Sequence, residues 1–178
     1  MAKIPLPLAE VYSLLEPGPV VLLTTSSAGV PNVMTLSWQT MLEFEPPLVG
    51  CVVSSRNHSF AALDATGECA INIPTARIAD AVAGCGNTSG RNTDKFAAFG
   101  LTPQPASRVR APLIAQCFAS LECRVTDRSL VPRYDLFVLE VLAAWTDPEL
   151  ADHPTLHHRG YGAFMLAGET IRLPSKMR

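Results

Sequence analysis

The stretch that decides the fold reads Pro31-Asn32-Val33-Met34-Thr35-Leu36-Ser37-Trp38, then, after a short bridge, Pro46-Pro47-Leu48-Val49-Gly50-Cys51-Val52-Val53, and ends Ser54-Ser55-Arg56-Asn57-His58-Ser59. The first two pieces have the composition of strands, and both run into small polar side chains. The third piece supplies an arginine and then what resembles a helix start. This arrangement suits a ligand that combines a flat polar face with a dianionic tail.

The length and composition predict one globular domain over residues 1–178. Hydrophobic residues make up 48% of the chain and charged residues 17%, which excludes a disordered chain. The formal net charge of −2 argues against a nucleic-acid-binding protein, which normally carries a basic face. The mean hydropathy of +0.20 is high for a soluble monomer, so we expect some apolar surface to be buried against a second copy.

The N-terminus and the cysteines indicate a cytoplasmic protein. The first residues lead into prolines without the apolar segment of a signal peptide, and no apolar run approaches the ~20 residues that span a bilayer. The five cysteines are odd in number and contain no C-x-x-C pair. We therefore expect buried thiols in a reducing compartment, and no association with membranes.

Hydrophobic periodicity predicts a mainly β fold with short helices. Strands are expected over 20–25, 30–38, 48–53, 69–73, 117–126, 136–145 and, as a last short one, 169–173. Helices are expected over 8–16, 59–67, 75–83 and 94–100. In the strand over 117–126, odd-numbered residues should face inward and Ser120, Glu122 and Arg124 outward. Because strands and helices do not alternate regularly, a β-barrel with appended helices is favoured over a doubly wound sheet.

The first candidate site lies at the end of the strand over 30–38. Asn32, Thr35, Ser37 and Trp38 would offer polar groups and one aromatic ring to a ligand. The alternative is an ordinary amphipathic strand with a solvated polar face and Trp38 in the core. Spacing alone favours that alternative, because such strands are common.

Two further segments have the residues of an anion site. Residues 54–59 combine serine hydroxyls, Arg56 and the free N–H groups of a helix start, although an ordinary capped helix with a solvated arginine fits equally. Two more cations stand beside another helix start in Ser89-Gly90-Arg91, followed by Asp94-Lys95-Phe96. The alternative is an exposed loop, where charged residues are common. Taken together the segments favour anion binding, because that chemistry recurs in a chain without a basic excess.

Other sites are not supported by the sequence. The four histidines lack H-x-x-x-H spacing and have no carboxylate cluster beside them, so we expect no metal site. The G-x-S-x-G and G-x-x-x-x-G-K-[ST] motifs do not occur. No G-x-G-x-x-G follows a strand, so a nicotinamide cofactor would have no Rossmann domain of its own.

An ordered series of segments resembles the flavin reductase-like, FMN-binding split-barrel family, close to its flavoredoxin branch. The series runs over nearly the whole chain, from about residue 19 to residue 169. Besides the stretch quoted first, it includes Asn72-Ile73-Pro74, Ser89-Gly90-Arg91 with Asp94-Lys95-Phe96, Gly100-Leu101-Thr102, and Ala111-Pro112-Leu113-Ile114 leading to Leu121-Glu122-Cys123. The order of these segments is far more specific than any one of them.

The resemblance implies a homodimeric FMN-binding split β-barrel that holds FMN non-covalently near the subunit interface. The residues implied to line the flavin ring and ribityl chain are Asn32, Val33, Met34, Thr35, Ser37 and Trp38. Those implied around the phosphate and ribityl hydroxyls are Ser54, Ser55, Arg56 and Ser59, with Ser89, Gly90, Arg91 and Lys95 closing over them. Val53 and Phe164 complete the expected cofactor-binding set. No catalytic side chain is implied, because the flavin supplies the redox chemistry.

Two departures from the family pattern concern positions near the expected flavin. Relatives often have histidine where this chain has Tyr134, and glycine where it has Leu139. A tyrosine is a far weaker acid than a histidine near neutral pH, so any role of that histidine must change here. The segment 157–164 resembles the family's H-R-x-G-G, with Tyr161 replacing one glycine. We expect its ring to narrow access to the flavin.

The resemblance implies an oxidoreductase, for which three hypotheses remain open. The first is an NAD(P)H-dependent flavin reductase that passes electrons through FMN to a flavin, ferric or protein acceptor, by hydride transfer from nicotinamide C4 to flavin N5. The second is a flavoredoxin-like electron carrier that binds FMN but does not oxidise NAD(P)H. The third is a split barrel that holds another ligand or none.

Overall fold

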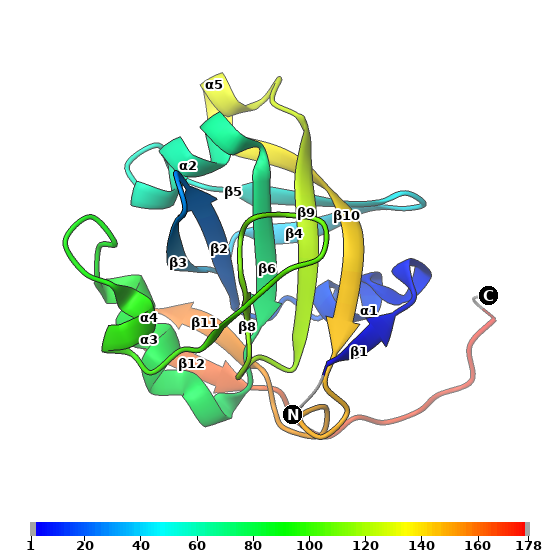
Figure 1. Cartoon of the computed structure of the whole chain (residues 1–178). Helices are drawn as coiled ribbons and strands as arrows, with labels where there is room; N and C mark the ends of the chain where they lie inside the picture. Colours follow the sequence, from blue (N-terminus) through cyan, green and yellow to red (C-terminus); the bar gives the residue numbers. More distant parts are fainter. Residues whose placement is uncertain (1–2, 177–178) are drawn as a thin grey trace.

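The computed structural model describes residues 3–176 and is built on one large antiparallel sheet (Figure 1). Its strand order is β3-β2-β6-β9-β10-β5-β4, and β1 also pairs with β10. The strands are β1 (Ile4–Leu6), β2 (Val21–Ser27), β3 (Val30–Leu36), β4 (Gln39–Phe44), β5 (Pro47–Val52), β6 (Glu68–Ile73), β9 (Ala119–Asp127) and β10 (Leu136–Thr146). Two small sheets pair β7 (Pro103–Gln104) with β8 (Leu113–Ile114), and β11 (Leu156–Gly160) with β12 (Ala163–Leu166). The predicted mainly β class is confirmed.

Short helices cover the ends and one side of the sheet. They are η1 (Leu8–Glu10), α1 (Tyr12–Leu15), α2 (His58–Thr66), η2 (Ala76–Ile78), α3 (Ala79–Asn87), α4 (Lys95–Ala98) and α5 (Val131–Tyr134). In Figure 1, α3 and α4 lie together beside hairpin β11–β12, and α2 lies across one end of β2 and β3. None of the helices within residues 3–176 has the length and apolar content needed to cross a bilayer.

Strand β2 is buried on both faces, and this double burial positions the helices. Val21 and Leu23 point into the main core, which also contains Ile71 and Leu121. Leu22 points the other way, into a second apolar cluster formed with α3 and α4. Because side chains alternate along a strand, a continuous apolar run such as 20–23 requires cover on both sides. The two helices supply that cover, and they thereby lie beside β3.

Ser120 and Glu122 lie on the face of β9 opposite the main core, as predicted, but they are not exposed, because a segment from elsewhere in the chain covers that face. Both side chains are fully buried. Residues 106–113 pack over them with the help of Val109, Ala111 and Leu113. Glu122 accepts hydrogen bonds from the Ser107 and Arg108 amides, the Ser107 hydroxyl and the Trp145 indole. A buried carboxylate with four donors holds this covering segment against β9.

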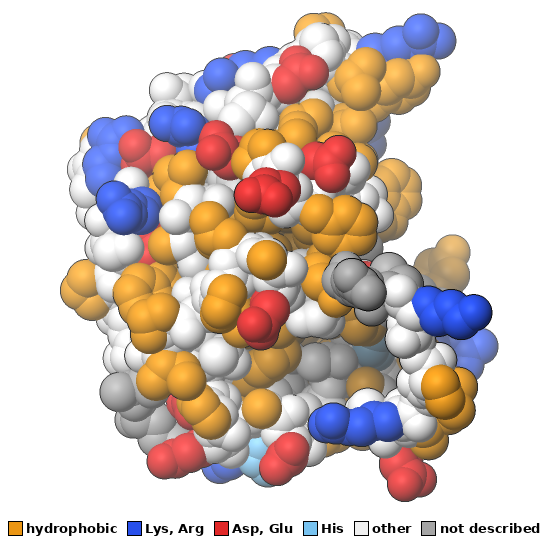
Figure 2. All heavy atoms as spheres, turned by 90° about the vertical axis from the view of Figure 1, so that its right-hand side faces the viewer, with side chains coloured by type: hydrophobic (Ala, Val, Ile, Leu, Met, Phe, Trp, Pro, Cys, Tyr) orange, Lys and Arg blue, Asp and Glu red, His pale blue; other side chains and the backbone are white. Residues whose placement is uncertain are grey.

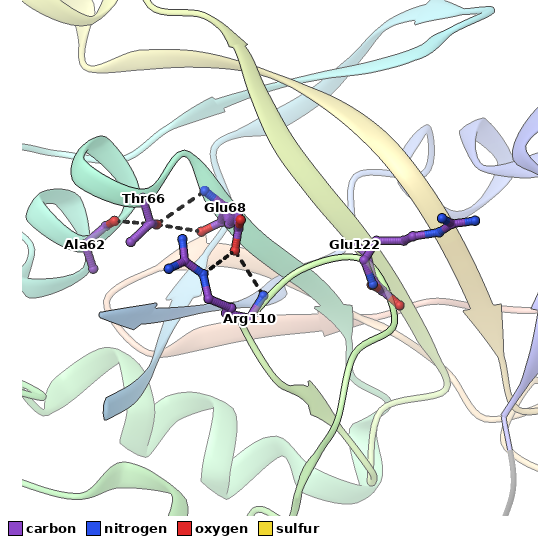
Figure 3. A network of polar contacts seen from close by, with 6 residues as sticks. Ala62, Thr66, Glu68, Arg110 and Glu122 are labelled. Atoms are coloured by element: carbon purple, nitrogen blue, oxygen red, sulfur yellow. Dashed lines mark hydrogen bonds and ion pairs between the residues drawn. The ribbon is translucent and has the colours of Figure 1, made fainter. Parts of the chain in front are cut away.

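A second carboxylate binds the same segment near its middle, at Arg110 (Figure 3). Glu68 Oε2 accepts hydrogen bonds of 3.0 Å from both the backbone amide and Nε of Arg110. The Thr66 hydroxyl donates to the Ala62 carbonyl at 2.7 Å and accepts from the Glu68 amide at 3.3 Å, so the end of α2 is joined to the start of β6. Figure 3 shows Glu122 apart from this group, on the neighbouring strand. The two carboxylates therefore fix the segment at separate points.

Several predicted boundaries need correction. The short bridge after Trp38 contains an additional strand, β4, and the tail forms hairpin β11–β12, which raises the strand number above the six or seven expected. Residues 169–173, predicted as a strand, have no regular structure. Helix α3 does not end at Gly84 but continues to Asn87. A β-carbon at Gly84 would stand 2.4 Å from Phe99 Cε1, so this glycine serves a close helix contact and not a helix end.

Candidate functional site

The structure gathers polar residues from four separate segments around a cavity of about 270 Å³ that is open to solvent. The segments are β3, the start of α2, the end of α3 and the loop that leads to α4. The lining residues are Asn32, Met34, Thr35, Arg56, Asn57, His58, Ser59, Cys85, Gly86, Asn87, Thr88, Ser89, Gly90 and Lys95. We call this the first cavity. Two cations, Arg56 and Lys95, and the N-terminus of α2 favour an anionic group inside it.

The N-terminus of α2 forms one side of the first cavity. Asn57 occupies the N-cap position in an extended conformation, but its side chain accepts no hydrogen bond from the first turn. The amides of that turn are therefore not capped by a side chain, and the positive end of the helix dipole faces the cavity rim. The exposed Arg56 guanidinium precedes it. This is the donor arrangement that phosphate groups occupy at helix N-termini.

Asn32 connects β3 to α2 across the floor of the first cavity. Its Nδ2 donates a 2.8 Å hydrogen bond to Oγ of Ser59, which is itself buried. Gly90 lies directly against the Asn32 side chain, and any larger residue there would collide with it. The loop over 88–90 can therefore close over β3 only because position 90 has no side chain. The result is a floor of fixed donors and acceptors.

Lys95 brings a buried ammonium group to the opposite wall. Only 5% of the residue is exposed, and Nζ donates a 2.8 Å hydrogen bond to the Cys85 carbonyl at the end of α3. Asp94 caps α4 by accepting hydrogen bonds from the Phe96 and Ala97 amides at 3.0 and 3.2 Å. This cap fixes the start of α4 at Lys95. Burial lowers the pKa of Lys95, while the neighbouring Cys85 raises it. A buried ammonium group with N–H donors still available is strongly stabilised in its charged form by a nearby anion.

A second cavity of about 260 Å³ adjoins the first and is less polar. The two share Thr35, Gly86 and Asn87. Its other lining residues are Val20, Ser37, Val82, Ala83, His158, Gly162 and Phe164. The Thr35 hydroxyl donates a 2.6 Å hydrogen bond to the Val82 carbonyl, so β3 and α3 are joined at the boundary between the cavities.

Hairpin β11–β12 closes the outer side of the second cavity. The Val20 amide donates a 2.7 Å hydrogen bond to the Leu156 carbonyl, which attaches the hairpin to the start of β2. The rings of His158 and Phe164 lie 5.3 Å apart with a 51° tilt. Aromatic and aliphatic walls with a few hydroxyl and amide groups suit a flat ring system with polar edges.

Most of the residues predicted from sequence lie around these two cavities. Eight of them line the first: Asn32, Met34, Thr35, Arg56, Ser59, Ser89, Gly90 and Lys95. Ser37 and Phe164 line the second, with Thr35 again. One of the two predicted strand ends, in β3, and both predicted helix starts therefore share one continuous hollow.

Six predicted residues lie outside the two cavities. Val33 and Val53 are fully buried in the apolar clusters, so their side chains are packed away from the hollow. Trp38, expected beside a flavin ring, is 71% exposed, because the chain leaves β3 after Leu36 and enters the edge strand β4. The remaining three are Ser54, Ser55 and Arg91. The Ser55 amide donates a 3.0 Å hydrogen bond to Asp135, which anchors the segment before Arg56.

Sequence reasoning missed the contribution of the end of α3. Cys85, Gly86, Asn87 and Thr88 line the first cavity because the helix continues beyond its expected end at Gly84. Burial raises the pKa of the Cys85 thiol to about 11, so it is neutral at physiological pH. Asn57 and His58 were within the quoted motif but were not assigned to the site. The signal that was available is the polar run over 86–93, whose first two residues are the last two of α3.

The two tyrosines that depart from the family pattern lie at exposed positions. Tyr134 ends α5, where the Arg133 guanidinium lies 5.0 Å from the centre of its ring. It lines neither cavity. Tyr161 stands at the tip of hairpin β11–β12 with a φ of 50°, next to Gly162 in the lining of the second cavity. Its ring is fully exposed in the single chain, so narrowing of the cavity by Tyr161 stays a prediction.

Comparison with known proteins identifies the family of the chain. Residues 14–164 match the family model described as flavin reductase like domain. The uncharacterized protein YddH of Escherichia coli is 30% identical, with 94% of this chain and 96% of that protein covered.

Solved structures extend the likeness to the fold. An FMN-binding domain of a flavin reductases-like enzyme from Shewanella baltica has a TM-score of 0.91 and 27% identity, over 97% of this chain and 98% of that one. Flavoredoxin of Desulfovibrio vulgaris shares the fold with a TM-score of 0.79 at 22% identity, over 88% and 90% of the two chains. With its matching sequence model and its split-barrel neighbours, the chain belongs to the flavin reductase-like family.

Proposed function

We propose that this chain is an FMN-binding oxidoreductase, with the flavin phosphate in the first cavity and the isoalloxazine ring in the second. The observation that carries the proposal is the continuous hollow, whose cationic half ends at an uncapped helix and whose apolar half is closed by an aromatic hairpin. A mononucleotide has the same division into a dianionic end and a flat ring. The FMN-binding relative from Shewanella baltica adds support.

The chain's own residues fit the phosphate end. Arg56 and Lys95 offset the two negative charges, and the first turn of α2 offers amide donors. The Asn32–Ser59 pair and Thr88 supply further polar groups for the ribityl hydroxyls. Gly90 leaves the space that a side chain at this position would fill.

The ring end requires positioning rather than acid–base chemistry. A bound flavin supplies the hydride acceptor and the electron relay. The residues of this chain would hold its ring between α3 and hairpin β11–β12, where Thr35 and Ser37 would offer hydrogen-bonding groups and Val82 and Phe164 would exclude water. The proposed electron donor is NAD(P)H, and the proposed acceptor is a flavin, a ferric compound or a protein.

One preparation tests both the cofactor and the donor. The purified chain is expected to be yellow, or to become so on addition of FMN, and to consume NADH or NADPH at 340 nm when a flavin, quinone or ferric acceptor is present. A colourless protein that takes up no FMN would contradict the proposal. A yellow protein that is inert toward both nicotinamides would identify the second candidate, a flavoredoxin-like electron carrier.

We further propose that the chain works as a homodimer. Edge strand β4 and the residue before it present large exposed hydrophobic side chains, namely Trp38, Leu42 and Phe44. Figure 2 shows hydrophobic side chains interspersed with acidic ones over the face that carries α1 and the tip of hairpin β4–β5. An unpaired edge strand with exposed aromatic residues is a common contact surface between copies.

The proposed location is the cytoplasm. All five cysteines are free and buried, which supports a reducing compartment.

A further inference from the structure

A groove of about 310 Å³ lies beside edge strand β4. We call it the β4 groove, and its lining residues are Tyr12, Glu16, Thr40, Met41, Leu42, Glu43 and Phe44. The rings of Tyr12 and Phe44 meet edge to face with their centres 5.1 Å apart, so α1 is packed against the end of β4. Leu42 and Phe44 are nevertheless 50% and 53% exposed in the single chain. The groove therefore leaves large apolar side chains in contact with water.

The backbone of β4 also has an open edge. Within residues 3–176, β4 ends the strand order of the main sheet and pairs with β5 alone. Alternate residues of such a strand direct their N–H and C=O groups away from the partner, and these groups form a template for a further strand. In natural proteins an edge of this kind is usually covered or protected by charges. The edge and the groove together form a receptor for an extended segment with apolar side chains on one face.

Residues 170–174 have the pattern of such a segment. Ile171 and Leu173 are two positions apart and would share one face of a strand, while Arg172 would lie on the other. Pro174 would end the pairing, because it has no N–H. In the single chain this segment has no regular structure, and Ile171 and Leu173 are 71% and 75% exposed. A strand forms only against a neighbour that shares its hydrogen bonds, so the pattern requires a partner strand outside the segment.

The charges of the segment complement those of β4. Phe44 faces Tyr12 of α1, and the residue before it, Glu43, therefore points toward the other face of the strand. Glu43 Oε1 accepts a 2.7 Å hydrogen bond from the Phe44 amide, and within residues 3–176 no ion pair includes this carboxylate. With Ile171 and Leu173 in the groove, Arg172 would lie on the same face as Glu43. Opposite charges on neighbouring strands stabilise their pairing.

The segment and the β4 groove lie on the same side of the molecule. Figure 1 shows the chain after β12 running outward to the side that carries α1 and the tip of hairpin β4–β5. In the single chain, residues 170–174 do not line the groove. Two copies related by a two-fold axis through this side can exchange their segments, and the one rotation then fills both grooves.

We propose that residues 170–174 of one copy add as a strand to β4 of a second copy, with Ile171 and Leu173 in the β4 groove and Arg172 beside Glu43. This inference rests on the proposed homodimer and deepens it, because it identifies the segment that covers the exposed edge. Each subunit supplies one segment and one groove. The exposed apolar side chains of both elements are thereby buried in a single reciprocal contact.

The strength of association of the full chain tests the inference. Sedimentation velocity over a range of concentrations gives the dissociation constant of the dimer. Ile171→Ser/Leu173→Ser should raise this constant at least tenfold, because both apolar side chains are lost from the groove. Val30→Ser/Leu130→Ser is the matched control, since it replaces two exposed apolar residues that do not line the β4 groove, and it should change the constant less than twofold.

A charge exchange tests the position of Arg172. Arg172→Glu should raise the dissociation constant at least threefold, because it places two carboxylates on neighbouring strands. Adding Glu43→Arg to the same chain should return the constant to within twofold of the wild type, which a general loss of folding or packing would not allow. Failure of Glu43→Arg to restore association would contradict the proposed pairing.

Engineered cysteines show which chain receives the segment. All five native cysteines are buried, so they should not react under mild oxidation. Arg172→Cys chains mixed with Glu43→Cys chains should form a disulfide between the two chains, whereas either variant alone should form much less. In the double variant Arg172→Cys/Glu43→Cys, a bond within one chain would show that the segment docks on its own chain, and would overturn the exchange.

The outcomes separate this inference from the proposals on which it rests. A wild-type dimer that Ile171→Ser/Leu173→Ser leaves unchanged would overturn this inference alone. A wild type that sediments as a monomer would overturn the proposed homodimer as well. Titration of the same protein with FMN reports on the proposed cofactor independently of both results.

Discussion

Gly90 lies so close to Asn32 that a β-carbon at position 90 would stand 1.9 Å from Asn32 Oδ1 and 2.7 Å from its Cγ. Side chains cannot overlap to this extent, so Asn32 would have to turn away. Turning would break its 2.8 Å hydrogen bond to Ser59. The contact joins the loop before α4 to the floor of the proposed phosphate site.

Gly90→Ala should therefore weaken FMN binding by about tenfold, which corresponds to ~1.4 kcal/mol. Gly90 does not have the left-handed backbone conformation that only glycine adopts readily, so the variant should fold normally. The measurement is a fluorescence titration with FMN, accompanied by thermal unfolding without ligand. Gly168→Ala is the control, because a β-carbon there meets nothing within 4 Å. Unchanged affinity in Gly90→Ala would remove this contact from the site.

Replacing Arg56 and Lys95 together with alanine should weaken FMN binding at least tenfold, or ~1.4 kcal/mol. The physical reason is the loss of both cations that line the proposed phosphate site. Riboflavin, which has no phosphate, should lose much less affinity in the same variant. The double variant Arg77→Ala/Lys176→Ala changes the net charge equally at exposed positions away from the two cavities. Equal losses for FMN and riboflavin would contradict the phosphate assignment.

Glu122 should make the protein sensitive to acid. Burial raises the pKa of its carboxyl, but the hydrogen bonds from Ser107, Arg108 and Trp145 outweigh burial and bring the pKa below its ordinary value. A group whose pKa is lowered by folding stabilises the native state above its unfolded pKa. That stabilisation is lost as the pH falls through the lower, folded pKa.

The corresponding experiment compares urea unfolding from pH 7 to pH 3 in the wild type and in Glu122→Gln. The variant should be less stable at pH 7 by about 1–3 kcal/mol, because an amide cannot accept all the hydrogen bonds of the carboxylate. Its stability should also fall less steeply in acid. Glu169→Gln, at an exposed position, should behave as wild type. Parallel curves for wild type and Glu122→Gln would exclude this carboxylate as the source of acid sensitivity.

Trp38→Glu should convert the proposed dimer to a monomer. A charge within the proposed apolar contact would lose its hydration without gaining a partner, which disfavours association. Sedimentation velocity of the variant measures the mass directly. Val30→Glu is the control, since Val30 is also largely exposed but is the first residue of β3, on the far side of the sheet order from β4. A wild type that sediments as a monomer would refute the dimer itself.

The sequence predicted those elements whose cause is local. The apolar run over 20–23 predicted β2, and Gly67, in a left-handed conformation, ends α2 as its position indicated. Strand β4 was missed because most of its side chains are exposed in the single chain, so it lacks the usual apolar alternation. The burial of Glu122 was missed because its cover comes from residues 106–113, which the pattern within β9 does not contain.

The residues of the candidate site also divide into those with a local cause, which were predicted, and those that depend on distant segments, which were missed. Its cationic half was predicted because Ser54 to Ser59 and Ser89 to Lys95 are short continuous motifs. The end of α3 was missed because Gly84 was interpreted as a helix stop, whereas it is required by the close approach of Phe99. The orientation of Trp38 depends on the turn into β4, and no periodicity within its own strand reveals that turn.

The first cavity takes its walls from β3, α2, α3 and the loop before α4, which are distant from one another along the chain. A molecule bound there acts as a cross-link between all four. By mass action, a free cofactor concentration one hundred times the dissociation constant raises the free energy of unfolding by about 2.7 kcal/mol. Cells starved of riboflavin should therefore accumulate less of this protein, because its cofactor-free form is the one most exposed to proteolysis.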